Sequence, residues 1–113
     1  MNTTEKNINP FEALDFIRDN ANEYGRLKAY ATFMTEKRKT IKSALMQRSL
    51  ETTESAKESW AYAHPEYIQH LEEMRDAIAE YETLRILIVA AEAKIEAWRS
   101  LEATARSEIR LTQ

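Results

Sequence analysis

The stretch Ala63-His64-Pro65-Glu66 decides how the sequence is divided, because it separates two long segments of helical pattern. From Arg26 to the end of the chain there is no glycine, and Pro65 is the only proline. Proline lacks a backbone N–H and pushes the preceding residue out of the α region, so a helix is predicted to end near Ala63. The same proline suits the first position of the next helix, where Glu66 meets free N–H groups. We therefore expect two helices and a reversal of the chain at residues 64–65.

The composition is typical of an all-α protein with one domain. Of the 113 residues, 43% are hydrophobic and 31% are charged, while glycine occurs once and proline twice. Strand-rich folds need these two residues at their turns, whereas the abundant Ala, Glu, Leu, Arg and Lys favour helices. The sequence thus predicts a long antiparallel helical hairpin.

What the sequence lacks disfavours several classes of protein. Without cysteine there is no disulfide framework, no thiolate zinc site and no cysteine nucleophile. The polar N-terminus does not look like a signal peptide, and the apolar run 86–91 is far shorter than the roughly 20 residues of a membrane span. A single glycine also rules out a P-loop or a dinucleotide fingerprint. We expect a cytoplasmic, non-enzymatic protein without cofactor or membrane association.

The first helix is expected over residues 10–63, after a disordered tail at 1–8. Asn9 suits the N-cap, Pro10 the first helical position and Glu12 the capping box. Two interruptions remain open: at Gly25, because glycine costs about 1 kcal/mol relative to alanine in a helix, and at 49–55, where hydroxyl side chains compete for the backbone. An apolar seam with alternating spacings of three and four residues follows this helix: Ile17, Asn20, Tyr24, Leu27, Ala31, Met34, Arg38, Ile41 and Leu45.

The second helix is expected over residues 65–111. Its seam has the same alternating spacing and contains Tyr67, Leu71, Met74, Ile78, Tyr81, Leu84, Ile88, Ala91, Ile95, Trp98, Glu102, Ala105 and Ile109. A reversal at 64–65 places residues opposite each other when their numbers add up to about 129. The expected pairs are Leu45 with Leu84, Ile41 with Ile88, Met34 with Ile95, Ala31 with Trp98 and Tyr24 with Ala105.

The second helix also carries apolar residues outside its seam. Residues 86–91 are apolar on every side, and a helix segment of this kind is normally buried all round. One hairpin cannot bury it, so we expect a homodimer that forms a four-helix bundle. The alternative is that the N-terminal segment breaks at Gly25 and folds back over this patch. The predicted interface residues are Ile86, Leu87, Val89, Ala90 and Leu101.

Basic residues are concentrated in one part of the first helix. Residues 26–48 carry seven basic and one acidic side chain, whereas residues 49–113 carry seven basic and thirteen acidic ones. Interleaved with Tyr30 and Phe33, such cations can bind a phosphate backbone or an acidic protein, or they can form a solvated face that pairs with the second helix. In the expected register residues 37–42 face the weakly charged 87–92, so pairing within the chain is poor there. The candidate binding residues are Arg26, Lys28, Lys37, Arg38, Lys39, Lys42 and Arg48.

The remaining candidates point to structural roles. His64 is expected to cap a helix and His70 to lie on the surface, because Glu66-x₃-His70-x₂-Glu73 does not match a carboxylate-bridged metal site. Trp60 and Trp98 are expected in the core or at an interface between chains, with an exposed anchor for a partner as the alternative. Neither catalytic nor metal-ligating residues are predicted.

Three stretches resemble a loose group of small helical proteins of temperate phages and prophages. They are Ala63-His64-Pro65-Glu66-Tyr67, Ile95-Glu96-Ala97-Trp98-Arg99-Ser100 and Ala103-Thr104-Ala105-Arg106. The similarity covers roughly residues 25–110, and proteins of this group tend to be encoded near single-strand-annealing recombinases. The group has no settled activity. The resemblance implies a viral or mobile-element origin, action in the host cytoplasm if the chain is encoded by a phage, and a context of DNA recombination.

Three functions are consistent with these features. The first is an accessory protein of phage DNA recombination or replication that binds a protein or nucleic acid through its basic helix face. The second is an inhibitor of a host defence system, such as a nuclease or CRISPR complex, that acts by protein–protein binding or by acidic charge mimicry. The third is a structural component of the virion or its assembly. For the second function the acidic partner face is Glu72, Glu73, Asp76, Glu80 and Glu82.

Overall fold

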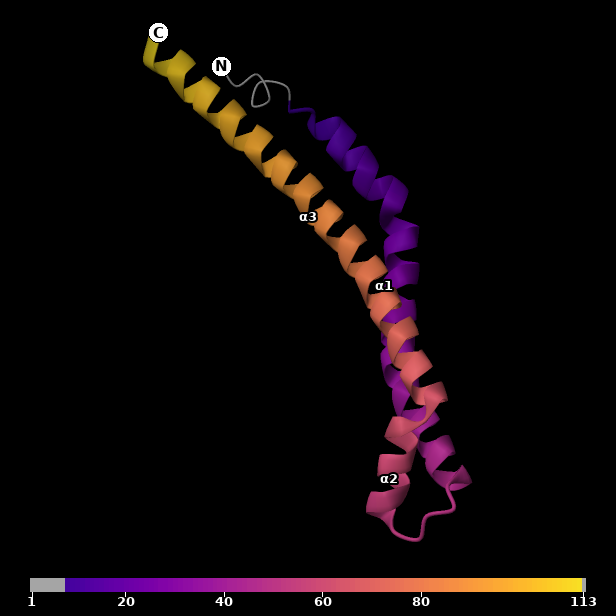
Figure 1. Ribbon diagram of the computed structural model, residues 1–113. Helices are drawn as coiled ribbons and strands as arrows, with labels where there is room; N and C mark the ends of the chain where they lie inside the picture. Colours follow the sequence, from indigo (N-terminus) through magenta and orange to yellow (C-terminus); the bar gives the residue numbers. More distant parts are fainter. Residues whose placement is uncertain (1–7, 113) are drawn as a thin grey trace. The chain divides into compact units, whose positions relative to one another are not determined.

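A computed structural model describes residues 8–112 of the chain, and within them the secondary structure is all α (Figure 1). The helices are α1 (Pro10–Arg48), α2 (Glu54–Ala63) and α3 (Pro65–Thr112). The described residues divide into two compact units, one made of residues 24–82 and the other of residues 8–23 with 83–112. Helices α1 and α3 therefore contribute to both units. The expected tail at residues 1–8 lies almost entirely outside the described residues.

The unit of residues 24–82 is an antiparallel hairpin of α1 against α2 and the start of α3. Three contacts fix its register: Lys42 Nζ lies 3.3 Å from Glu58 Oε1, Met34 O lies 2.6 Å from His70 Nε2, and the rings of Tyr24 and Tyr81 are 5.6 Å apart. In these three pairs the number of the α1 residue falls while the number of its partner rises, so the paired segments are antiparallel. The numbers of facing residues add up to roughly 104.

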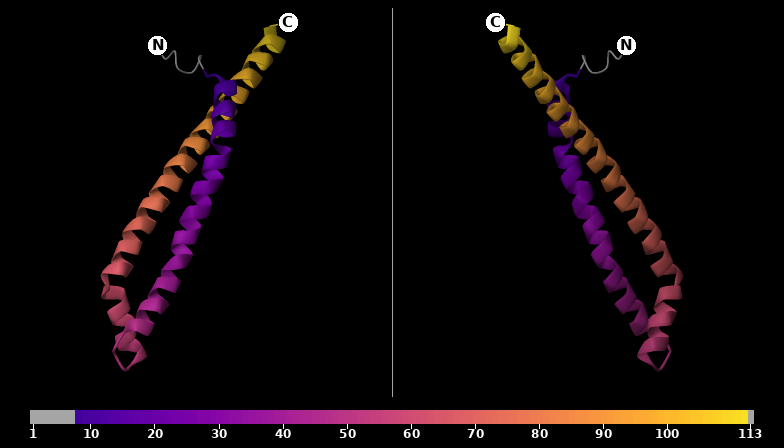
Figure 2. Two further views of the ribbon diagram at one scale, coloured as in Figure 1. Left: turned by 90° about the vertical axis from the view of Figure 1, so that its right-hand side faces the viewer. Right: turned by 90° about the vertical axis from the view of Figure 1, so that its left-hand side faces the viewer.

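The chain reverses direction at residues 49–53, and the predicted reversal at 64–65 is wrong. Both views in Figure 2 show the connection from α1 to α2 at one end of this unit's hairpin. The Ser49 hydroxyl accepts from the N–H of Glu51, and the Thr53 hydroxyl accepts from the N–H of Ala56, each at 3.1 Å. These hydroxyl groups end one helix and cap the next, which is the competition with the backbone expected for this segment.

Pro65 does separate two helices, as predicted, but the chain continues on the same side of α1. His64 has an extended backbone with φ −71° and ψ 136° between α2 and α3. Residues from both sides of this junction, Ala61 and Tyr67, form a buried cluster with Leu45. The register is therefore shifted by about 25 residues from the expected one, and the five pairs predicted from it are wrong: Leu45–Leu84, Ile41–Ile88, Met34–Ile95, Ala31–Trp98 and Tyr24–Ala105.

Helix α1 runs through Gly25 without a break, so the alternative in which the N-terminal segment breaks there is wrong. The predicted N-cap is confirmed, because the Asn9 side chain accepts from the N–H groups of Phe11 at 3.0 Å and Glu12 at 3.3 Å. The seam of α1 is also confirmed: all nine of its residues are buried or half-buried. Helical periodicity thus identified the contact face correctly even though the register was wrong.

In the unit of residues 8–23 and 83–112, the N-terminal turns of α1 pack against α3. Ala13 and Ala91 are both buried at this contact, with exposed fractions of 5% and 6%. The seam of α3 is buried or half-buried here only as far as Trp98. The expected seam residues Glu102, Ala105 and Ile109 are exposed, because α1 begins at Pro10 and no described segment of this unit continues alongside α3.

Candidate functional site

The seven predicted binding residues of α1 do not form one free basic face. Lys39 forms an ion pair with Glu36 at 3.1 Å, Lys42 with Glu58 at 3.3 Å and Arg48 with Glu66 at 3.1 Å. Glu58 and Glu66 lie opposite α1 because the chain reverses at 49–53. The expectation that residues 37–42 face residues 87–92 is therefore wrong, and Lys42 has a carboxylate partner on α2 that the expected register did not give it.

Lys42 is the most constrained of these cations. Its Nζ lies over the ring of Tyr62, 4.9 Å from the ring centroid, in addition to its contact with Glu58. Hydrogen bonding with Tyr62, followed by the hydrogen bond and charge of Glu58, raises the pKa of Lys42 above its ordinary value despite its partial desolvation. Lys42 thus links α1 to α2 and is poorly placed to bind a separate molecule.

Two of these cations and two aromatic side chains form an exposed row on α1 with spacings of four, three and four residues. This basic-aromatic row consists of Arg26, Tyr30, Phe33 and Lys37. Tyr30 and Phe33 are 46% and 57% exposed, and Lys37 Nζ lies 5.8 Å from the centroid of the Phe33 ring. Because residues three and four apart share a helix face, the two rings and the two cations are presented together.

Lys28 and Arg38 lie near the row without belonging to it. Arg38 is half-buried in the α1 seam, and Lys28 lies beside Thr32 and Thr35 in a shallow groove whose α3 wall includes Tyr81. Among residues 8–112, no carboxylate forms an ion pair with Lys28, Lys37 or Arg38. These three cations carry what remains of the predicted basic face.

The predicted acidic residues lie mostly on one exposed flank of α3. Glu73 accepts a hydrogen bond from Gln69 at 3.2 Å, and Asp76 forms an ion pair with Arg75 at 3.1 Å. Glu72 and Glu80 are exposed and form no ion pair within the described part of the chain, whereas Glu82 is half-buried. We define the acidic row as Glu73, Asp76 and Glu80, which share a helix face at spacings of three and four residues.

His70 is buried, and the prediction that it lies on the surface is wrong. It is 3% exposed, and its Nε2 lies 2.6 Å from the carbonyl oxygen of Met34. Since a carbonyl oxygen can only accept, Nε2 carries the proton and donates. The capping role of His64 is confirmed: it is the C-cap of α2, and its Nδ1 accepts from the N–H of Glu66 at 3.1 Å. No group of three metal-ligating side chains occurs among residues 8–112.

The two tryptophans are half-buried. Trp60 packs against the buried cluster around Leu45, and its ring centroid lies 5.0 Å from that of His64. Trp98 is the last half-buried seam residue of α3. The core role expected for tryptophan is thus confirmed for Trp60.

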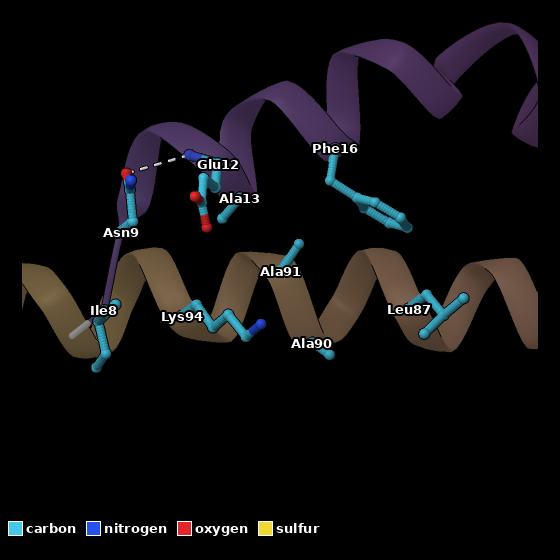
Figure 3. A pocket seen from close by; sticks show the side chains of 9 residues that line it. All are labelled: Ile8, Asn9, Glu12, Ala13, Phe16, Leu87, Ala90, Ala91 and Lys94. Carbon is cyan, nitrogen blue, oxygen red and sulfur yellow. Dashed lines mark hydrogen bonds between the residues drawn. The ribbon is translucent and has the colours of Figure 1, made fainter. Parts of the chain in front are cut away.

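In the unit of residues 8–23 and 83–112, a groove runs between α1 and α3. Figure 3 shows Phe16 pointing from α1 toward α3, with Ala13 and Ala91 facing each other. Glu12, Lys94 and Asn9 place a carboxylate, an ammonium group and an amide among the apolar side chains of these walls. The groove therefore offers apolar contact beside a few polar groups.

The predicted interface residues are all exposed in the single chain. Ile86 is 57% exposed, Val89 50%, Leu87 49% and Leu101 46%, and Ala90 is also exposed. Within the described residues, no helix is long and apolar enough to cross a membrane.

Sequence reasoning missed the two residues that connect the helices most directly, Tyr62 and His70. A detectable signal existed for His70, because it lies three residues after Tyr67 and seven before Ala77 and so falls on a wide helical stripe. No comparable signal existed for Tyr62, because its contact with Lys42 depends on where the chain turns.

Comparison with protein-family models, curated proteins and solved structures finds no match to this chain.

Proposed function

We propose that this protein is a non-enzymatic adaptor that binds a protein partner through the basic-aromatic row of α1. The observation that carries the proposal is the exposure of Tyr30 and Phe33, 46% and 57%, between the cations Arg26 and Lys37. Tyrosine and arginine are enriched among the residues that dominate binding energy, and aromatic rings on a helix lose little side-chain freedom on binding. A row of this kind suits a partner with an apolar groove bordered by carboxylates.

A protein partner fits the charges better than a nucleic acid does. The unit of residues 24–82 contains nine basic and ten acidic side chains, so it has no net positive charge. Three of the seven predicted binding residues of α1 are already paired with the chain's own carboxylates, namely Lys39, Lys42 and Arg48. Since affinity for nucleic acid depends on the phosphates that a protein neutralises, three unpaired cations support only weak, salt-sensitive binding.

The resemblance to phage proteins suggests the context in which such an adaptor works. The partner in that context is a protein of DNA recombination or replication, and the adaptor holds it at a fixed place on a stiff helix. The resemblance gives this context, and the exposed row gives the binding face.

The test compares variants of the row with a matched charge variant outside it. Tyr30→Ala with Phe33→Ala, and separately Lys37→Glu, are used as baits in lysate of the cell in which the chain is made, beside Lys39→Glu as the control. Lys39 is equally exposed but is paired with Glu36. We expect a protein captured by the natural chain and by Lys39→Glu to be lost with both row variants. Equal capture by all four chains would contradict the proposal.

A nucleic-acid arm distinguishes the two kinds of partner. Labelled single- and double-stranded DNA are titrated at low salt and followed by fluorescence anisotropy. We expect no saturable binding below roughly 100 µM, whereas nonspecific nucleic-acid binders reach Kd values of about 1–100 µM. Saturable binding that is lost in Lys37→Glu would assign the row to nucleic acid instead.

The acidic row supports a second candidate function, inhibition of a defence protein by charge mimicry. Glu72 and Glu80 are exposed and unpaired within the described residues, and Glu80 shares a helix face with Glu73 and Asp76. Reversal of Glu73 and Glu80 to lysine is expected to abolish this function and to leave binding through Tyr30 and Phe33 intact. The opposite pattern is expected for the adaptor function.

A further inference from the structure

A second apolar stripe runs along α3 outside its buried seam, and one of its residues, Ala90, also borders the groove with α1. It consists of positions spaced by four and three residues: Ile86, Ala90, Ala93, Ala97, Ser100 and Thr104, flanked by Val89 and Leu101. We call these eight residues the α3 stripe; all are exposed and none is charged. In contrast, Leu84 and Ala91 on the other side are buried. Figure 3 shows Ala90 pointing away from α1.

We infer that the α3 stripe is a self-association surface through which two copies of this chain pair their α3 helices in antiparallel orientation. The spacings of four, three, four, three and four residues read the same in both directions about a point between Ala93 and Ala97. A two-fold axis through that point places Ala93 opposite Ala97 of the second copy, Ala90 opposite Ser100 and Ile86 opposite Thr104. An interface of two identical surfaces requires this self-complementarity.

The size of the side chains fits the same arrangement. The small residues Ala90, Ala93, Ala97 and Ser100 occupy the centre and allow close approach of the two helices, while Ile86 lies at one end and Leu101 near the other. The two-fold axis also brings Leu87, which is 49% exposed, toward Leu101 of the second copy. At about 1.5 Å per residue, the contact from residue 86 to residue 104 is roughly 27 Å long.

Four large apolar side chains supply most of the apolar surface beside the small residues of the stripe. Ile86, Leu87, Val89 and Leu101 are each about half-exposed. Because the surface is uncharged as well as self-complementary, a second copy is the occupant that it fits best.

The charges beside the stripe do not oppose this pairing strongly. Glu96 approaches Glu96 of the second copy across the two-fold axis, but each is paired with Arg99 of its own chain at 2.9 Å. Lys94 also approaches Lys94 of the second copy, and Glu12 lines the same groove in each chain. This inference is independent of the proposed function, because the stripe contains no residue of the basic-aromatic row.

A charge-exchange experiment tests both the association and its orientation. Ala93→Glu and Ala97→Lys each place one charge in the centre of the stripe, and both positions are exposed in the single chain. The double variant places each new carboxylate opposite a new ammonium group only if the helices are antiparallel in the stated register. Ala21→Glu, at an exposed alanine of α1, is the matched control.

The readout is molar mass by sedimentation equilibrium, with circular dichroism to check that each variant is helical. For the natural chain and Ala21→Glu we expect twice the 13.2 kDa of one chain at about 10 µM. Each single stripe variant is expected to raise the dimer Kd at least tenfold, and the double variant to restore it to within about threefold. A monomeric natural chain, or single variants that dimerise normally, would overturn the inference. Failure of the double variant to restore association would overturn the antiparallel register.

Discussion

His70 Nε2 donates to the carbonyl oxygen of Met34 across the hairpin, at 2.6 Å and with only 3% of His70 exposed. This bond joins α3 to the middle of α1 and fixes the register of the unit of residues 24–82. It also fixes the tautomer of the ring, because the acceptor has no proton to give.

Replacement of His70 by alanine is therefore expected to destabilise the chain. The variant loses a buried hydrogen bond and leaves a void between the helices, at a cost of about 2 kcal/mol. The measurement is urea unfolding followed by circular dichroism. Gln69→Ala, one residue away on the exposed surface, is the control and is expected to change stability by less than about 0.5 kcal/mol. Equal stability of His70→Ala and the natural chain would mean that His70 is not in this contact.

Gly25→Ala is expected to stabilise the chain by about 1 kcal/mol. Gly25 lies inside α1 without a positive φ, and a Cβ built at this position meets no other atom within 4 Å. The methyl group therefore restricts the unfolded chain at no cost to the helix. Thermal unfolding measures the effect as a rise in Tm. A fall in Tm would show that α1 bends or breaks at this residue.

Thr53→Ala is expected to cost about 1 kcal/mol, because it removes the side chain that caps α2. The Thr53 hydroxyl accepts from the N–H of Ala56 at 3.1 Å, whereas Thr52 is exposed and precedes the cap. Thr52→Ala is thus a matched control that removes the same atoms from the same turn. Chemical unfolding of the two variants should separate them, and identical midpoints would place the helix start elsewhere.

Lys42→Met is expected to reveal a pH-dependent contribution to stability. The pKa of Lys42 is raised in the folded chain above its ordinary 10.5, through Tyr62 and Glu58. A raised folded-state pKa stabilises fully below the unfolded pKa and is lost as the pH rises through the folded value. The natural chain should therefore exceed the variant in stability at pH 8, and this difference should shrink above about pH 10.5. A difference that is constant or grows with pH would contradict the contact.

The sequence predicted which faces of the helices are buried, because burial follows a helical period that each segment carries by itself. All nine seam positions of α1 are buried or half-buried, from Ile17 to Leu45. The boundary at Pro65 was also predictable, since it rests on the covalent structure of proline. These features depend only on residues that are neighbours along the chain.

The register was not predictable in the same way. Proline ends a helix but does not determine the direction of the next one, whereas a pair of hydroxyl groups in 49–53 ends α1 and caps α2 where the chain turns. A reversal displaced by about 13 residues shifts every facing pair by about 25, so Lys42 and Arg48 pair with Glu58 and Glu66 instead of facing residues near 87 and 81. The residues of the candidate site could therefore be named from the sequence, but the sequence did not show which of them form ion pairs within the chain.

The most direct test of this account is a distance across the hairpin. The chain has no cysteine, so Lys37→Cys with Gln69→Cys places two spin labels at unique exposed positions, and dilution with unlabelled chain removes distances between copies. A reversal at 49–53 puts these residues on neighbouring helices, whose axes pack about 10 Å apart, so double electron–electron resonance should give a label distance below about 25 Å. A reversal at 64–65 would separate them along the helices by roughly 35 Å, and a distance of that length would contradict the account.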